Sequence, residues 1–204
     1  NEQYHSKHGA IQEAYHVFIE SGLRFFLKTY NTPKPISILE IGFGTGLNAF
    51  ITFLEVKNKS ISIDYVGVEA YPVSSNEVEK LNYVKELDVT KFSTTFSKLH
   101  SISWEEKHLI SDNFSLIKRK QFFEEIKDID SFDIIYFDAF GARNQPELWT
   151  QEIFEKMYKA LKPKGILTTY SAKGSVRRAM QSVGFLVERL PGPPGKREML
   201  RAIK

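Results

Sequence analysis

Residues 36–48 read Ile36-Ser-Ile-Leu-Glu-Ile-Gly-Phe-Gly-Thr-Gly-Leu-Asn48, a short apolar run that ends in alternating glycines. The apolar part, 36–41, predicts a buried β-strand, and the segment 47–56 that follows the glycines has a helical pattern. A second apolar run over 61–69 predicts the next strand. Strand, glycine turn, helix and strand form the βαβ unit of a parallel sheet, so we expect an α/β fold.

The glycine turn marks the expected ligand site, because parallel α/β sheets bind ligands beyond the carboxyl ends of their strands. Gly42, Gly44 and Gly46 let the backbone pass close to a ligand where a Cβ would collide. Glu40 stands just before the turn, where an acid favours a sulfonium cation. Glu69 closes the second strand, where a carboxylate can accept both ribose hydroxyls of a nucleoside.

Two kinds of nucleoside cofactor compete for this arrangement. The nicotinamide or flavin fingerprint is Gly-x-Gly-x-x-Gly, in which a pyrophosphate meets a helix N-terminus. Here the third glycine comes one position early, and S-adenosylmethionine carries no phosphate. The spacing therefore favours S-adenosylmethionine, and a tight turn that binds nothing remains the structural alternative.

The rest of the chain alternates in the same way, which predicts a Rossmann-like class I methyltransferase fold. We expect a mostly parallel sheet with a C-terminal antiparallel hairpin closed by a proline-glycine loop at 191–195. Residues 1–35, which carry an amphipathic segment and a breaker cluster at 31–35, are predicted to be an N-terminal helical extension that packs on the catalytic domain, 36–204. Further expected strands are 114–117, 132–138, 166–170, 185–190 and 198–203, and further expected helices are 73–88, 122–126, 146–161 and 175–183, with 91–103 a helix or loop and 104–113 irregular.

Composition excludes several classes of protein. The 204 residues are 42% hydrophobic and 26% charged, as in an ordinary globular chain, and the net charge of +3 is compatible with a polyanionic partner. There is no cysteine and no apolar run near 18 residues, so we expect no disulfide, no membrane span and a cytoplasmic protein. The chain begins with Asn1 rather than Met, and we expect its natural start upstream. No metal is expected, because the histidines lack zinc-type spacing: His5, His8, His16, His100 and His108.

Asp138 ends the most apolar strand, and the loop 139–146 must then pass over the mouth of the cofactor site. If the methyl acceptor is an amine, Asp138 can orient it and accept its proton. A helix N-cap or a loop hydrogen bond is the alternative role for this residue.

Four blocks in order along the chain resemble the family of methyltransferases that complete 5-methylaminomethyl-2-thiouridine at the tRNA wobble position, found as half of the bifunctional MnmC protein or as a stand-alone MnmD-type enzyme. Their sequences are Tyr4-His-Ser with Gly9, Glu13 and His16-Val-Phe18; Glu40-Ile-Gly-Phe-Gly-Thr-Gly-Leu-Asn48; Asp138-Ala-Phe-Gly-Ala-Arg-Asn-Gln-Pro-Glu-Leu-Trp149; and Val176-Arg177 with Gly184-Phe185 and Gly195-Lys-Arg-Glu-Met-Leu200.

The resemblance implies S-adenosylmethionine bound by the loop 40–48 and Glu69, with Phe43 and Asn48 among the contacts, and Asp138 facing the aminomethyl group. It also implies a separate partner enzyme for the preceding carboxymethyl-removing step. Where the family has Asn-Pro, this chain has Gln145-Pro146. The family often has Gly-Asp after the third strand, but 119–121 read Arg-Lys-Gln, which leaves the adenine contact unassigned.

Contacts with a tRNA anticodon stem-loop can come from cations and aromatic rings near the mouth. Phe140, next to Asp138, is the expected stacking residue for an extruded wobble base, with Tyr71 as a further candidate and Trp149 as a core residue. The expected phosphate contacts are Arg143, Arg177, Arg178, Lys196 and Arg197, of which the pair 196–197 follows a rigid turn.

Two other functions remain open from the residues. A methyl- or aminopropyl-transferase acting on a small amine such as a polyamine shares this fold and an acid at this strand end. A catalytically silent RNA-binding module that retains the fold is the third reading.

Overall fold

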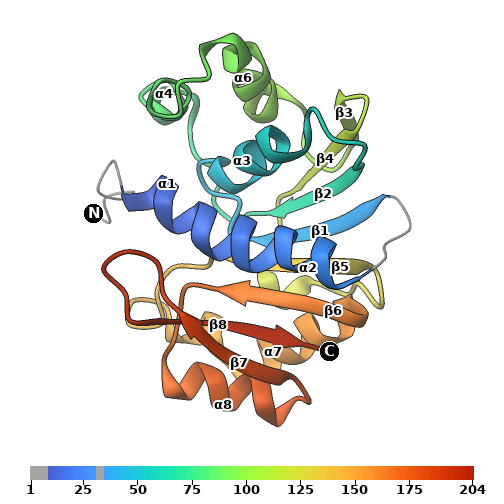
Figure 1. Ribbon diagram of the computed structural model, residues 1–204, viewed down its shortest axis with the longest axis vertical. Coiled ribbons are helices and arrows are strands. Elements are labelled where there is room, and N and C mark those ends of the chain that lie inside the picture. Colours follow the sequence, from blue (N-terminus) through green and yellow to red (C-terminus); the bar gives the residue numbers. More distant parts are fainter. Residues whose placement is uncertain (1–8, 31–34) are drawn as a thin grey trace.

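A mixed sheet runs through the protein, whose computed structural model describes residues 9–30 and 35–204. Over these residues eight strands are hydrogen-bonded in the order β3-β4-β2-β1-β5-β6-β8-β7 (Figure 1). The strands are β1 (Ile36–Ile41), β2 (Ile63–Val68), β3 (Lys107–Ser111), β4 (Phe114–Arg119), β5 (Phe132–Phe137), β6 (Leu161–Thr169), β7 (Leu186–Pro191) and β8 (Glu198–Ile203).

The order of the strands places a ligand crevice beside β1. The strand β1 pairs in parallel with β2 on one side and with β5 on the other, β2 continues to β4, and β5 continues to β6. The chain therefore builds outward from β1 in one direction and then returns to build in the other. In such sheets the ligand binds beyond the carboxyl ends of the strands where this reversal occurs. At the far edge, β8 pairs antiparallel with both β6 and β7, so the predicted Rossmann-like fold with a C-terminal hairpin is confirmed.

Helices cover both faces of the sheet. The segment 9–29, α3 and α6 share one buried apolar cluster with β1 and β2, while α7 and α8 share another with β5 and β6 on the opposite face. The longer helices are α3 (Leu47–Val56), α6 (Ser93–Ser101), α7 (Gln151–Ala160) and α8 (Gly174–Ser182), and the shorter ones are α4 (Ser75–Val78), α5 (Tyr83–Glu86), η2 (Thr90–Phe92), η3 (Phe123–Glu125) and η4 (Pro146–Trp149).

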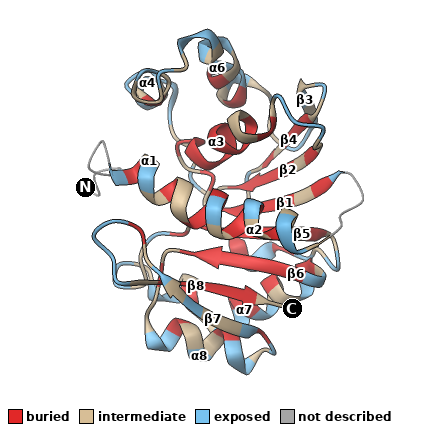
Figure 2. Ribbon diagram, in the orientation of Figure 1, coloured by how far each residue is buried: buried red, intermediate tan, exposed pale blue. Residues whose placement is uncertain are grey.

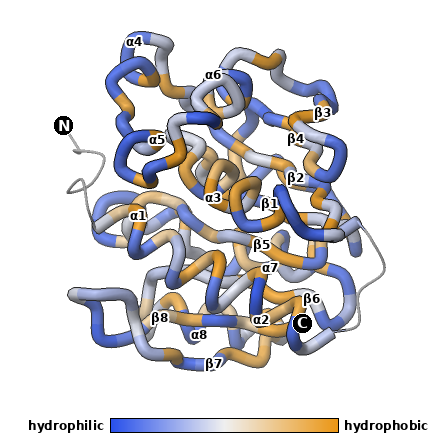
Figure 3. Tube along the Cα trace, turned by 45° about the horizontal axis from the view of Figure 1, so that its top comes forward, coloured by the Kyte–Doolittle hydropathy of each residue, from blue (hydrophilic) through white to orange (hydrophobic). Residues whose placement is uncertain are grey.

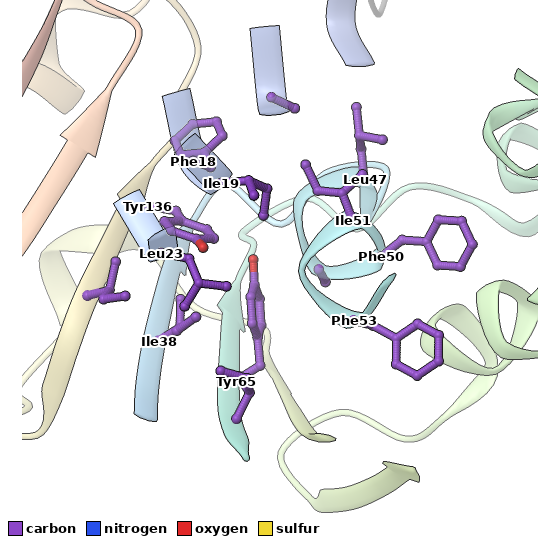
Figure 4. Packing of buried hydrophobic residues seen from close by; sticks show 14 of the residues in the cluster. Phe18, Ile19, Leu23, Ile38, Leu47, Phe50, Ile51, Phe53, Tyr65 and Tyr136 are labelled. Carbon is purple, nitrogen blue, oxygen red and sulfur yellow. The ribbon is translucent and has the colours of Figure 1, made fainter. Parts of the chain in front are cut away.

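One long helix at the N-terminal side lies across the sheet (Figure 1). It consists of α1 (Gly9–Ala14), the π-helical η1 (Tyr15–Arg24) and α2 (Phe25–Thr29), which follow one another without a break. Its apolar side packs Phe18 and Leu23 against Ile38 and Tyr136 of the sheet (Figure 4). At Gly22 a Cβ would lie 3.2 Å from the ring of Tyr136, so the helix backbone approaches the sheet closely. The predicted amphipathic segment is thus part of the main core.

Burial explains why the parallel strands could be recognised from sequence. The strands β1, β2 and β5 and the part of β6 after Lys164 are buried on both faces by helices, and they appear mostly red in Figure 2. Such strands read as continuous apolar runs, and Figure 3 shows the same strands and α3 as hydrophobic stretches surrounded by hydrophilic loops. Each fully buried aromatic side chain in them contributes about 2 kcal/mol through removal of its surface from water.

The structure corrects several predicted bounds. The segment 104–113 is not irregular: it contains β3, an edge strand with a mostly polar, partly exposed sequence that offers no apolar pattern to detect. The predicted helix 73–88 is two short helices, α4 and α5, with a break between them. The predicted helix 146–161 is the 3₁₀ turn η4 followed by α7, and the strand β6 already begins at Leu161 because Leu161 pairs with Phe132 before a bulge in the register.

Some sequence predictions fall outside the described residues. These are the part of the N-terminal block at 4–6, the histidines His5 and His8, and most of the breaker cluster at 31–34. Within the described part of the chain, no helix has the length and apolar character needed to cross a membrane. In the same part, no group of three or more His, Cys, Asp or Glu side chains is placed to hold a metal ion.

Candidate functional site

A cavity of about 590 Å³ opens at the carboxyl ends of the central strands, at the position that the strand order indicates. This volume lies in the range of sites for small molecules and cofactors. The residues that line the cavity are Glu13, Glu40, Gly42, Phe43, Gly44, Thr45, Leu47, Asn48, Glu69, Ala70, Tyr71, Phe122, Phe123, Glu124, Asp138, Ala139, Phe140, Gly141, Gln145, Leu148, Tyr170 and Lys196.

The glycine loop forms one wall of the cavity, and its backbone requires glycine. Gly42, Gly44 and Gly46 have φ values of 89°, 47° and 69°, a region that disfavours other residues. A Cβ on Gly42 would lie 2.8 Å from the carbonyl oxygen of Asp138, so only glycine allows the loop to pass beside the end of β5. Gly46 does not line the cavity; it stands at the N-terminus of α3 and shapes the loop from outside.

Glu69 holds the glycine loop in place. Its Oε2 accepts a hydrogen bond from the Gly44 amide at 3.0 Å, and its Oε1 accepts one from the Tyr71 amide at 2.9 Å. Each carboxylate oxygen has a second lone pair, so Glu69 can still accept hydroxyl groups of a ligand in the cavity. The sequence indicated this carboxylate as a ligand contact but not its bond to the loop.

Phe43 supports the same loop from behind. Its ring is 3% exposed and packs on Gly67, where an added Cβ would lie 2.3 Å from the ring. His100 and Trp104 meet the ring edge-on at centroid distances of 6.3 and 6.5 Å. Sequence reasoning missed Gly67, whose lack of a side chain makes room for this ring in the middle of β2.

Asn48 joins the two acids at the centre of the site. Its Nδ2 donates to Glu40 Oε1 at 2.9 Å and to Asp138 Oδ2 at 2.8 Å, and the hydroxyl of Tyr65 donates to Glu40 Oε2 at 2.9 Å. The two carboxylates fix the orientation of the amide, because both need a donor. The other amide atom, Asn48 Oδ1, is buried and has no hydrogen-bond partner among the described residues.

The surroundings of these acids raise their pKa values. Complete burial raises the pKa of Glu40 well above its usual range, against the opposing hydrogen bonds from Asn48 and Tyr65. Burial raises the pKa of Asp138 to about 7; the hydrogen bond from Asn48 opposes this shift, the charge of Glu13 adds to it and the charge of Lys196 opposes it. A pKa near neutral suits a group that accepts a proton in a reaction.

The backbone after Asp138 is fixed by two side-chain hydrogen bonds. The Tyr170 hydroxyl donates to the Ala139 carbonyl at 2.7 Å, and Trp149 Nε1 donates to the Phe140 carbonyl at 2.8 Å. Trp149 is buried, so its prediction as a core residue is confirmed, while the Phe140 side chain is 44% exposed at the cavity. Gln145 also lines the cavity, and its buried Oε1 has no partner in the described part of the chain.

Across the glycine loop from Asp138, the segment 122–124 lines the cavity together with Tyr71. The rings of Tyr71 and Phe122 meet edge-on at 5.9 Å, although both are largely exposed. This segment follows the carboxyl end of β4, just after the stretch 119–121 in which the sequence left the adenine contact unassigned. Arg119 belongs to the strand and pairs with Asp128 at 2.8 Å.

The predicted basic contacts separate into two groups. Lys196 lines the cavity, where its Nζ lies 2.7 Å from Glu13 Oε1. Arg143 and Arg197 are exposed and do not line it. Glu13 itself was not predicted as a site residue, because it lies on the N-terminal helix, 183 positions before Lys196. No sequence pattern relates two residues so far apart.

The chain matches a family model described as S-adenosyl-L-methionine-dependent methyltransferase over residues 79–204, more than half of its length. The matched part contains Asp138, Tyr170 and Lys196, and it begins after the glycine loop. The loop and the family match are therefore two separate indications of the same cofactor.

Curated relatives are similar over nearly the whole chain. The tRNA 5-methylaminomethyl-2-thiouridine biosynthesis bifunctional protein MnmC of Leptospira borgpetersenii is 28% identical over 215 residues, which covers 97% of this chain and 31% of that protein. The MnmC protein of Hydrogenovibrio crunogenus is 28% identical over 207 residues, which covers 96% of this chain and 30% of that protein. The chain thus spans about a third of the length of these relatives.

Solved structures support the fold. The crystal structure of MNMC2 from Aquifex aeolicus is similar with a TM-score of 0.68 and 23% identity, covering 98% of this chain and 63% of that one. The CurJ carbon methyltransferase is similar with a TM-score of 0.57 and 12% identity, covering 97% of this chain and 56% of that one. Because the family model matches more than half of its length, the chain belongs to the family of S-adenosyl-L-methionine-dependent methyltransferases, and S-adenosyl-L-methionine is its cofactor.

Proposed function

We propose that this protein methylates the amine of 5-aminomethyl-2-thiouridine at the wobble position of tRNA. The observation that carries the proposal is Asp138, which lies beside the glycine loop, is held by Asn48 and has a pKa of about 7. The names of the relatives supply the substrate class, since they refer to tRNA 5-methylaminomethyl-2-thiouridine biosynthesis.

The residues of the cavity fit the cofactor. The glycine loop offers a backbone surface without side chains, and Glu69 retains lone pairs for ribose hydroxyls. Asn48 Oδ1 is a buried acceptor without a partner among the described residues, suited to a donor on the ligand. We propose that the segment 122–124 and Tyr71 hold the adenine, because they form the wall beyond Glu69. When bound, S-adenosyl-L-methionine supplies an electrophilic methyl group on a sulfonium centre.

The protein has to present an amine with a free lone pair to that methyl group. In its ionised form Asp138 accepts a hydrogen bond from the amine and then its proton, while Asn48 continues to hold the second carboxylate oxygen. Fixing the amine in line with the methyl group removes most of the entropic cost of the encounter. Glu40 is fully buried and bonded through both oxygens, so we assign it to the positioning of Asn48.

The tRNA contacts belong to the same proposal. Phe140 is exposed beside Asp138 and is placed to stack on an extruded base, while Arg143 and Arg197 are exposed cations available to phosphates of the anticodon stem-loop. A partner enzyme or a further domain supplies the free amine, and the reaction takes place where tRNA is modified, in the cytoplasm.

The test is mass spectrometry of tRNA nucleosides after incubation with S-adenosyl-L-methionine. Transfer RNA that carries the aminomethyl group should gain one methyl group on that nucleoside, and the same tRNA without the aminomethyl group should gain none. Methylation should fall steeply with salt, because phosphate contacts release counterions. Equal or better turnover of a polyamine, with little salt dependence, would identify a small-amine transferase, and calorimetry without cofactor binding would leave only a silent RNA-binding module.

A further inference from the structure

A primary ammonium group of the protein already sits in the acceptor side of the cavity. Lys196, on the loop between β7 and β8, places its Nζ 2.7 Å from Glu13 Oε1 and 4.2 Å from the centroid of the Tyr170 ring. In Figure 1 this loop (red) reaches toward the start of the N-terminal helix (blue). All three side chains line the same cavity as Asp138.

A carboxylate and an aromatic face together recognise an alkylammonium ion. The carboxylate neutralises its charge, and the ring quadrupole attracts it with about 0.5–1 kcal/mol at exposed sites and more when water is excluded. The Glu13 side chain is 24% exposed, so it is partly withdrawn from water. Tyr170 is held against movement by its bond to the Ala139 carbonyl, one residue beyond Asp138.

The ion pair of Glu13 and Lys196 lies within electrostatic reach of Asp138, the proposed proton acceptor. The charge of Glu13 raises the pKa of Asp138, and the charge of Lys196 lowers it. An ammonium bound between Glu13 and Tyr170 is therefore close to the carboxylate that would later take its proton. The acceptor amine of the proposed reaction is itself a primary alkylamine, which carries a proton at neutral pH just as lysine does.

We propose that Glu13 and the face of Tyr170 form the receiving site for the protonated amine of the acceptor, and that Lys196 occupies this site until the acceptor displaces it. This inference rests on the proposed function and states how the acceptor side of the cavity selects its substrate. The exchange replaces one ammonium by another, so Glu13 stays paired throughout. Because the Lys196 side chain is already 39% exposed, the displaced ammonium group can pair with an incoming phosphate.

The exchange is energetically accessible. Lys196 is 39% exposed, and ion pairs this open to water are worth about 0–1 kcal/mol. An acceptor that brings its own contacts in the cavity can displace such a group at a small cost in free energy. Glu13 is then a substrate-positioning residue, and it determines specificity for an amine over an uncharged group.

The experiment measures binding without turnover. The full chain, saturated with S-adenosylhomocysteine at pH 7, is titrated with 5-aminomethyluridine or with 5-methyluridine, which lacks the amine, and followed by ligand-observed NMR. We expect the wild-type protein to prefer the amine. Glu13→Gln should weaken binding of the amine roughly fivefold and leave 5-methyluridine unchanged. Lys196→Met should strengthen binding of the amine roughly threefold, because the internal competitor is removed.

The opposite signs of the two variants separate the inference from a loss of folding, since a damaged protein would not bind more tightly. Equal affinity of the wild-type protein for both nucleosides, including no detectable binding of either, would overturn the inference. So would equal losses for both nucleosides in Glu13→Gln, or weaker amine binding in Lys196→Met. Methylation of tRNA is measured separately, so an inactive protein that still shows the amine preference would disprove the proposed function and not this site.

Discussion

The two sides of the cavity are built in different ways. The side that we propose to hold the cofactor comes mainly from one stretch, in which the glycine loop and Glu69 are joined by a single short crossover from β1 to β2. The acceptor side collects Glu13, Asp138, Tyr170 and Lys196 from segments that span nearly the whole chain. The cofactor side lies within one stretch of the chain, so a local sequence pattern can specify it. The acceptor side forms only when the N-terminal helix and the C-terminal hairpin meet.

Asn48 is the point at which the two sides meet. It stands in the first turn of α3, on the cofactor side, and donates to Asp138 at the end of β5. This division predicts that substitutions on the cofactor side change cofactor affinity alone and that substitutions on the acceptor side change the reaction alone. Substitutions at Asn48 should affect both.

The largest effect is expected on the cofactor side, from Gly44→Val. The φ of Gly44 is 47°, which a β-branched residue adopts only under strain, and Gly44 lines the cavity on the side that we propose to hold the cofactor. We expect calorimetry to show the affinity for S-adenosyl-L-methionine reduced by roughly 100-fold or more. Gly174→Ala is the matched control, because this glycine begins α8 away from the cavity. Unchanged affinity in the valine variant would contradict the assignment of the loop.

On the acceptor side, Asp138→Ala should separate the two functions most clearly. Loss of a positioned proton acceptor lowers turnover by about 100-fold or more. Cofactor affinity should remain within about twofold, because the glycine loop is bonded to Glu69 and not to the Asp138 side chain. Single-turnover methylation and calorimetry on the same preparation measure both quantities. Wild-type turnover would remove Asp138 from the mechanism.

The pH profile tests the connection through Asn48. Asp138 must be ionised to accept a proton, so turnover should rise about tenfold per pH unit below pH 7 and level off above it. The hydrogen bond from Asn48 lowers the pKa of Asp138, and its removal in Asn48→Ala should shift the rise to higher pH. At pH 7 we expect a loss of roughly fivefold in this variant, recovered at alkaline pH. A loss that is the same at every pH would show that Asn48 acts on something other than this carboxyl.

The last prediction concerns stability and leaves the reaction itself aside. The pKa of Asp138 is raised from 3.8 to about 7, so the folded state disfavours the ionised form; this contribution to stability is present below about pH 4 and lost as the pH rises through 7. Asp138→Asn cannot ionise, so at pH 8 it should be more stable than the wild type by about 1–2 kcal/mol, after allowance for the partial exposure of the site. At pH 4 the two proteins should unfold at the same urea concentration. Greater stability of the wild type at pH 8 would contradict the raised pKa.

The sequence predictions were accurate where a local apolar pattern exists and failed where residues are polar or isolated. The bounds of β1 and α3 are as predicted, because a strand buried on both faces and an apolar helix after glycines leave clear patterns. The edge strand β3 was missed, since its polar, half-exposed residues are held by pairing with β4 and not by an apolar face. Glu13 and Gln145 were missed as lining residues for a related reason, because an isolated polar residue has no period to detect.

By itself, the sequence determined the α/β class and the position of the glycine loop, because φ values open only to glycine and buried parallel strands both constrain residues close together in the chain. The spacing of the glycines also favoured S-adenosylmethionine over a dinucleotide. The sequence also indicated Asp138 from its place at a strand end. Only the tertiary structure decided what surrounds that acid: Asn48 on one oxygen, and Glu13 with Lys196 and Tyr170 beside it. Burial and neighbouring charges set the pKa and the selectivity of a site, and these depend on which distant segments the fold brings together.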